Sequence, residues 1–211
     1  MAKRLSALVS EIDTLRAQFL PYPFDPLGVY ADSDRVQAHT RAFLVLSHAE
    51  IESYLEESAK ELARASEVLW NRTGRISPPL AFLLASLGGR IATPASLSLK
   101  GAKDGQQQLA DEIKARLFPS FYKLIKDNHG VKELNVLQLF TPLGAPSSAF
   151  TSTMLANLDS LGSSRGTHAH HSAKAVTAVL DPETEYKRLQ TILNDFGVFE
   201  AWISNYRRRI R

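Results

Sequence analysis

The chain has 211 residues, of which 44% are apolar and 22% charged, so it can bury the core of one domain and is too apolar to be disordered throughout. It carries 25 Lys and Arg against 22 Asp and Glu, but four of the arginines lie in the last five residues. The rest of the chain is nearly neutral, so its charge does not by itself indicate a nucleic-acid-binding protein. We interpret residues 1–211 as a single domain, with an N-terminal helical extension at 1–28 and a basic tail at 206–211.

The absence of cysteine excludes a disulfide framework, a thiolate zinc site and a cysteine nucleophile. Charges at Glu11, Asp13 and Arg16 interrupt the first residues, which therefore do not resemble a signal peptide. The longest apolar stretch, at 78–87, has about half the length that a membrane span needs. We therefore expect a soluble, cytoplasmic protein that does not associate with a membrane.

Helical periodicity dominates the first part of the chain. The first predicted helix ends before Pro21 and has apolar residues at Leu5, Leu8, Ile12, Leu15 and Phe19. A long second helix is predicted from a cap at 32–34 to about Asn71. Its inward positions are predicted to be Val36, Phe43, Ile51, Leu55, Leu62 and Leu69. Prolines 78–79 and glycines 88–89 then bound a short apolar helix.

The second part of the chain continues this pattern without an alternating strand. Residues 91–105 are predicted to form a loop, and a helix from about Gln106 is expected to end or kink at Pro119. Further predicted elements are helical segments at 121–125 and 131–140, a loop at 141–146, a helix through Met154, Leu155 and Leu158, and a last helix that starts at 181–183 and continues through Ile203. These elements predict an all-α helical bundle of five to eight helices.

Three of the six histidines lie within residues 165–172, whose sequence is Arg-Gly-Thr-His-Ala-His-His-Ser. The small residues before them predict a helix that begins near Ser163 or Ser164 and places Arg165 in its first turn. On such a helix Arg165 shares a face with His168, whereas its five-residue spacing to His170 is oblique.

Three interpretations of this histidine cluster are open. The first is a solvated start of a helix. The second is a metal site held by His168 and His171, but cysteine is absent and the nearest downstream acid is Asp181, so we expect neither a metal nor another cofactor. The third is phosphate chemistry, in which the guanidinium of Arg165 neutralises a phosphate and an imidazole transfers a proton.

The segment from Arg165 to His170, with its Ala-His ending, resembles the Arg-x4–6-His motif of the HEPN superfamily. The preceding residues 158–164, Leu-Asp-Ser-Leu-Gly-Ser-Ser, resemble the usual lead-in to that motif. Residues 46–56, Leu-Ser-His-Ala-Glu-Ile-Glu-Ser-Tyr-Leu-Glu, resemble the first core helix of its RiboL-PSP-like branch. The resemblance implies an all-α fold and a metal-independent ribonuclease.

The resemblance also implies roles for named residues. His170 would act as general base or acid on the ribose 2′-OH and the leaving oxygen, and Arg165 would hold the scissile phosphate. His168 and His171 would support them, and Glu52 would orient an imidazole of the cluster. Gly166 departs from the family, which often has Asn, Asp or His after the arginine; His168 can partly replace that polar group.

The function expected from the resemblance is an endoribonuclease of toxin or defence character that leaves a 2′,3′-cyclic phosphate. We expect RNA as its substrate, a homodimer as its active form, and an antitoxin or another protein as a partner. The alternative is a non-catalytic HEPN-like module that binds RNA, a nucleotide or a protein. A third interpretation is a helical adaptor in which the histidine cluster is incidental.

Overall fold

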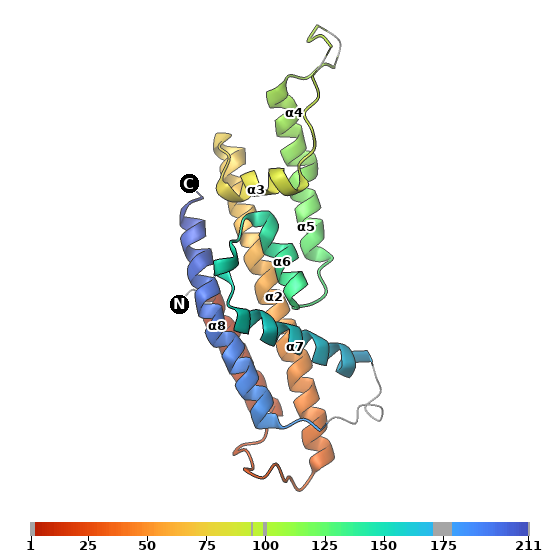
Figure 1. Cartoon of the computed structure of the whole chain (residues 1–211), viewed down its shortest axis with the longest axis vertical. Coiled ribbons are helices and arrows are strands. Elements are labelled where there is room, and N and C mark those ends of the chain that lie inside the picture. Colours follow the sequence, from red (N-terminus) through yellow and green to blue (C-terminus); the bar gives the residue numbers. More distant parts are fainter. Residues whose placement is uncertain (1–2, 94, 99–100, 171–178, 211) are drawn as a thin grey trace. The chain divides into compact units, whose positions relative to one another are not determined.

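The computed structural model describes residues 3–93, 95–98, 101–170 and 179–210, and for 164–170 it describes the backbone alone. Within these ranges the chain is helical and contains no strand (Figure 1), which confirms the all-α prediction. In chain order the elements are α1 (Lys3–Phe19), α2 (Ser33–Thr73), α3 (Pro78–Leu87), α4 (Gly105–Asp111), the π-helical segment η1 (Glu112–Leu117), α5 (Phe118–Lys126), α6 (Glu133–Phe140), the 3₁₀ turns η2 (Thr141–Leu143) and η3 (Ser147–Ala149), α7 (Ser152–His170) and α8 (Pro182–Arg208).

The chain forms two compact units. Unit 1 comprises Met1–Leu55, His129–Leu137 and Pro146–Ser204. Unit 2 comprises Glu56–Asn128, Gln138–Ala145 and Asn205–Arg211. The histidine motif and most of the predicted core segment at 46–56 therefore belong to unit 1.

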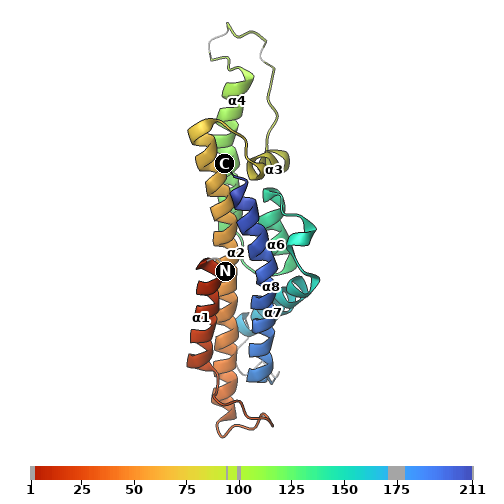
Figure 2. The same ribbon diagram turned by 90° about the vertical axis from the view of Figure 1, so that its left-hand side faces the viewer.

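In unit 1, α1, the first part of α2 and most of α8 lie side by side (Figure 2). The predicted apolar face of α1 is confirmed, because Leu5, Leu8, Ile12 and Leu15 are buried. Of the inward positions predicted for the part of α2 in unit 1, Phe43, Ile51 and Leu55 are buried and Val36 is half-buried; the two predicted for its part in unit 2, Leu62 and Leu69, are buried as well. The rings of α2 and α8 meet in this core, where Tyr54 lies 5.0 Å from Phe196 between ring centroids. Periodicity alone was sufficient to identify the faces that pack here.

A buried polar pair joins α2 to α8 within the same core. The hydroxyl of Tyr54 donates a hydrogen bond of 2.7 Å to Oε2 of Glu200, and both side chains are less than one tenth exposed. Burial, followed by the hydrogen bond to Glu200, raises the pKa of Tyr54. The Tyr54 hydroxyl therefore satisfies the buried carboxyl of Glu200, which lies among aromatic rings.

Helix α8 begins where the sequence predicted. Oδ2 of Asp181 accepts a hydrogen bond of 2.9 Å from the backbone N–H of Thr184, and the hydrogen bonds from Thr184 lower the pKa of Asp181. The residue before it is also fixed, since Gln37 of α2 exchanges two hydrogen bonds, of 2.7 and 2.8 Å, with the backbone of Leu180. A carboxylate at this end of a helix satisfies free N–H groups and complements the helix dipole.

In unit 2 the chain does not end its helix at Pro119. Helices α4 and α5 are joined through the π-helical segment η1, and Pro119 lies in the first turn of α5. The N–H of Phe118 donates to the carbonyl of Ile113, five residues earlier. Because proline lacks an N–H and crowds the preceding turn, this wider π-type turn accommodates it without a break.

The first residues of the predicted basic tail are part of α8. Tyr206 is buried and its hydroxyl donates a hydrogen bond of 2.7 Å to the carbonyl of Leu143. Arg207 forms an ion pair with Glu61 of α2, and Arg207 and Arg208 lie in the last turn of α8. Cations at this position complement the negative end of the helix dipole, so these arginines have a structural role.

Candidate functional site

Helix α7 carries the motif, and it unites the helix predicted through Met154, Leu155 and Leu158 with the one predicted to begin near Ser163 or Ser164. It runs without interruption as Ser152–His170, so Arg165 lies in its fourth turn and not in its first. The prediction of a helix start at Ser163 or Ser164 is therefore wrong. The apolar residues Leu158 and Leu161 are fully buried and hold this stretch in helical conformation, which overrides the local preference of glycine and serine for helix ends.

For the motif residues the structure describes the course of the backbone alone. Arg165, His168 and His170 lie on one continuous helix of unit 1. Their side chains fall outside the described residues, as does all of His171. The roles assigned to these four residues stay predictions.

Two polar contacts fix α7 just before the motif. Oδ1 of Asp159 accepts a hydrogen bond of 2.8 Å from the backbone N–H of Glu133, at the start of α6. On the next residue, Oγ of Ser160 accepts a hydrogen bond of 2.8 Å from Nη1 of Arg188 of α8. The segment from Leu158 to Gly162 is thus attached to two other helices by side chains that the sequence analysis did not single out.

The arginine that holds Ser160 is itself neutralised. Nη2 of Arg188 lies 2.5 Å from Oε2 of Glu185, one turn earlier on α8, and the two side chains are 18% and 14% exposed. Burial raises the pKa of Glu185, and the charge of Arg188 opposes that shift. The Arg188–Glu185 ion pair therefore holds α7 in place through Ser160, and it does not offer a free positive charge to a ligand.

Gly162 lies in the interior of α7, one turn before Arg165, and the side chain of Lys132 covers it. A Cβ atom at Gly162 would lie 2.8 Å from Cγ of Lys132 and 3.5 Å from its Cε. Lys132 immediately precedes α6 and is exposed to solvent. An isolated glycine inside a continuous helical pattern often has a packing reason, and here the reason is the Lys132 side chain that lies against Gly162.

Glu52 lies beside a different imidazole from the one predicted for it. Its Oε2 lies 3.6 Å from Nδ1 of His48, one turn earlier on α2, and the His48 side chain is only 2% exposed. The buried His48 and the half-buried Glu52 therefore form a local polar contact within α2. A role of Glu52 toward the histidine cluster remains a prediction.

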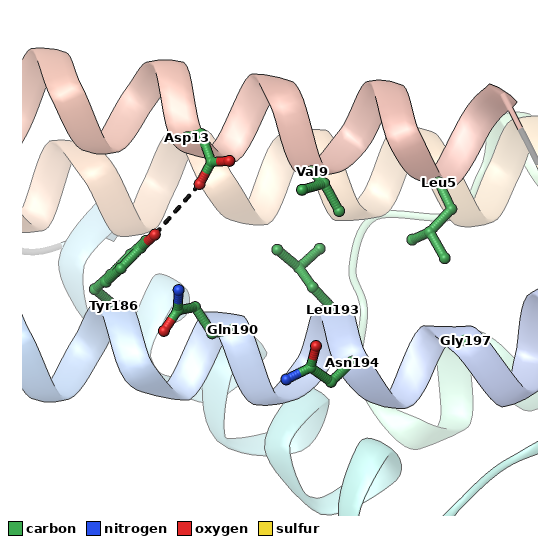
Figure 3. Close-up of a pocket in the computed structure, with 8 residues that line it drawn as sticks. All are labelled: Leu5, Val9, Asp13, Tyr186, Gln190, Leu193, Asn194 and Gly197. Carbon is green, nitrogen blue, oxygen red and sulfur yellow. Dashed lines mark hydrogen bonds between the residues drawn. The ribbon is translucent and has the colours of Figure 1, made fainter. Parts of the chain in front are cut away.

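A separate groove of about 450 Å³ lies between α1 and α8 in unit 1 (Figure 3). Leu5, Val9 and Leu193 supply its apolar part, and the hydroxyl of Tyr186 reaches Oδ1 of Asp13 at 3.3 Å. Burial raises the pKa of Tyr186. None of the eight residues that line the groove is a histidine, so it lacks the proton-transfer group that the predicted chemistry needs.

In the described part of the chain, which leaves out the side chains of the histidine cluster, no group of three or more His, Asp or Glu side chains lies close enough together to hold a metal ion. Also within these ranges, no helix has both the length and the apolar character needed to cross a membrane.

The comparisons with known proteins give one match. The model of the RiboL-PSP-HEPN family matches residues 3–199, a range that includes α1, the 46–56 segment and α7. No curated protein and no solved structure matches the chain. Since the matched range covers most of the 211 residues and the fold is all-α, the chain belongs to the RiboL-PSP-HEPN family.

Proposed function

We propose that this protein is a metal-independent endoribonuclease whose site is built on α7 around Arg165 and His170. The observation that carries the proposal is the family match over residues 3–199, which includes an Arg-x4-His sequence on a single continuous helix. HEPN domains are RNase-like or RNA-binding modules, and an arginine with a nearby imidazole provides the two groups that RNA cleavage without a metal requires.

In this reaction the imidazole of His170 takes the proton of a ribose 2′-OH. The 2′ oxygen then attacks the adjacent phosphorus, the bond from phosphorus to the 5′ oxygen breaks, and the leaving oxygen takes a proton from an imidazolium. Arg165 stabilises the negative charge that accumulates on the phosphate oxygens in the transition state. The products are a 2′,3′-cyclic phosphate and a free 5′-OH, so DNA is not a substrate.

The spacing on α7 favours a site shared by two copies of the chain. Positions five residues apart on a regular helix lie about 140° apart around its axis and about 7.5 Å apart along it. Arg165 and His170 therefore occupy different faces of the helix whose bounds include both. A two-fold axis near the motif would bring two arginines and two imidazoles to one phosphate, so that one imidazole serves as base and the other as acid.

The shared site predicts that activity depends on protein concentration. Light scattering is expected to show twice the mass of one chain, and the specific activity is expected to fall on dilution below the dissociation constant of the dimer. Analytical ultracentrifugation at the assay concentration provides the control. Full specific activity from a monomer would contradict the shared site while leaving the roles of Arg165 and His170 open.

The central test of the function is cleavage of a mixed-sequence RNA in excess EDTA. Cleavage is expected to persist, because the proposed chemistry uses only protein side chains and the 2′-OH, and the products should carry 2′,3′-cyclic phosphate ends detectable by mass spectrometry. The same oligonucleotide made as DNA should remain intact. Cleavage that stops in EDTA and returns with a divalent cation would contradict the mechanism.

A second candidate function is a non-catalytic module that binds RNA, a nucleotide or a protein, and Gly166 is the residue that favours it. The family often places a polar side chain directly after the arginine, and this chain has none there. Binding of RNA without any cleavage would support this alternative. The proposed endoribonuclease would act as a toxin or defence effector, with an antitoxin or another protein as its partner.

A further inference from the structure

A lysine outside α7 lies close to the motif helix. Glycine in a helix interior costs about 1 kcal/mol relative to alanine, and at Gly162 the space left by the missing side chain is occupied. The aliphatic stem of Lys132 crosses the helix there, since its Cγ and Cε lie 2.8 and 3.5 Å from where a Cβ of Gly162 would be. The ammonium group is one bond beyond Cε, on a residue that is exposed to solvent.

The backbone around Lys132 is held on both sides. Its carbonyl accepts a hydrogen bond of 3.0 Å from the N–H of Val136 in the first turn of α6. The next residue, Glu133, donates its N–H to Asp159 of α7 at 2.8 Å. Lys132 is therefore presented to α7 from a fixed position and not from a free loop.

The charge of Lys132 is available to a ligand. None of the side chains that the structure describes forms an ion pair with it, and the nearby carboxylate of Asp159 accepts the backbone N–H of Glu133. Arg188, which also reaches this part of α7, lies 2.5 Å from Glu185 and is mostly buried. Lys132 is thus a cation beside α7 that faces solvent and can bind an anion without first breaking an ion pair to any side chain in the described ranges.

Gly162 and Arg165 are three residues apart on α7, which is about one turn of the helix. Their positions therefore lie on one face, about 4.5 Å apart along the axis. We propose that the ammonium of Lys132 binds a backbone phosphate of RNA adjacent to the phosphate that is cleaved. A lysine acts as a compact point charge toward phosphate, and such contacts position the nucleic acid without reading its sequence. This inference rests on the proposed function.

The test is the binding of an RNA oligonucleotide that carries 2′-O-methyl groups and cannot be cleaved. Its affinity for Lys132→Ala is expected to fall about fivefold at 0.1 M salt, and the slope of log affinity against log salt to fall by about 0.7, the contribution of one phosphate contact on a single strand. Lys132→Arg should retain the slope. Lys114→Ala removes the same charge from an exposed residue of unit 2 and should leave it unchanged.

A second variant tests the position of the lysine and not merely its charge. Gly162→Ala places a methyl group against the Lys132 stem, so it should weaken binding in the wild-type background and have no further effect in Lys132→Ala. Circular dichroism and thermal unfolding show whether both variants fold. Equal losses from Gly162→Ala in the two backgrounds would overturn the proposed placement of Lys132.

The outcomes separate this inference from the proposed function. Cleavage of normal RNA together with unchanged affinity and salt slope in Lys132→Ala would overturn only the lysine contact. Binding that depends on Lys132 without any cleavage would keep the contact and overturn the nuclease. A protein that neither binds the oligonucleotide nor cleaves normal RNA would overturn both. A Lys132→Ala protein that loses only its dimer would assign the residue to a protein interface instead.

Discussion

Replacing His170 by alanine is expected to lower the rate of RNA cleavage by a factor of about 10² or more, because a group that transfers protons in the transition state is lost. Arg165→Ala is expected to cause a loss of at least similar size, since removing a group that stabilises transition-state charge costs about 10² to 10³ in rate. The measurement is the initial rate on a mixed-sequence RNA in EDTA, with protein above the dissociation constant of the dimer.

The controls for these variants separate chemistry from folding. His39→Ala removes an exposed imidazole of α2 and should cleave RNA like the wild type. The thermal unfolding of both motif variants should match that of the wild type, because polar side chains of a helix rarely contribute much to the stability of a fold. If His170→Ala keeps full activity, the assignment is wrong and His168 or His171 becomes the residue to test.

Tyr54→Phe is expected to lower the stability of the fold by removing one buried hydrogen bond. The substitution removes the donor of the buried hydrogen bond of 2.7 Å to Glu200 and leaves the rest of the ring in place. A buried acceptor that loses its donor costs about 1–3 kcal/mol, so the free energy of unfolding should fall by about that amount. Urea unfolding measures it, and Tyr22→Phe, at a ring that is 82% exposed, is the matched control.

The same tyrosine gives a pH dependence with a definite sign. Burial raises the pKa of Tyr54 above the value of about 10 in the unfolded chain, so its contribution is fully present below pH 10 and is lost as the pH rises toward the folded value. Burial also raises the pKa of Tyr206, to about 12. The wild type should therefore lose stability above pH 10, and Tyr54→Phe should lose less. Equal stability of the two proteins at pH 7 would contradict a structural role for the pair.

The helices could be predicted from the sequence wherever an apolar stripe repeats over several turns. α3 lies where Pro78 and Gly88 bound it, and α1 and α8 begin and end close to their predicted limits. The continuity of α7 could not be predicted in this way, because the sequence indicated one helix through Met154, Leu155 and Leu158 and a separate start near Ser163 or Ser164. Its glycine and serines favour helix ends locally, but the burial of Leu158 and Leu161 depends on tertiary packing that no local pattern shows.

The candidate site was predicted only in part for the same reason. The motif could be recognised because Arg165 and His170 are close together in the sequence. Lys132 and Arg188 are distant in the sequence from α7, and they reach it only because α6 and α8 pack against that helix. The burial of His48 was likewise undetermined, since a polar residue on a long helix can face either solvent or the core.

The hydrogen bond from Glu133 to Asp159 has a consequence for which substitutions can affect the motif. A carboxylate of α7 satisfies a backbone N–H at the start of α6, so neither helix can shift along its axis without exposing a polar group of the other. The sequence that determines where the motif lies is therefore distributed over two helices. A change at the start of α6 can misplace Arg165 and His170 although it touches neither residue, and inactivating substitutions should be sought there as well as in α7.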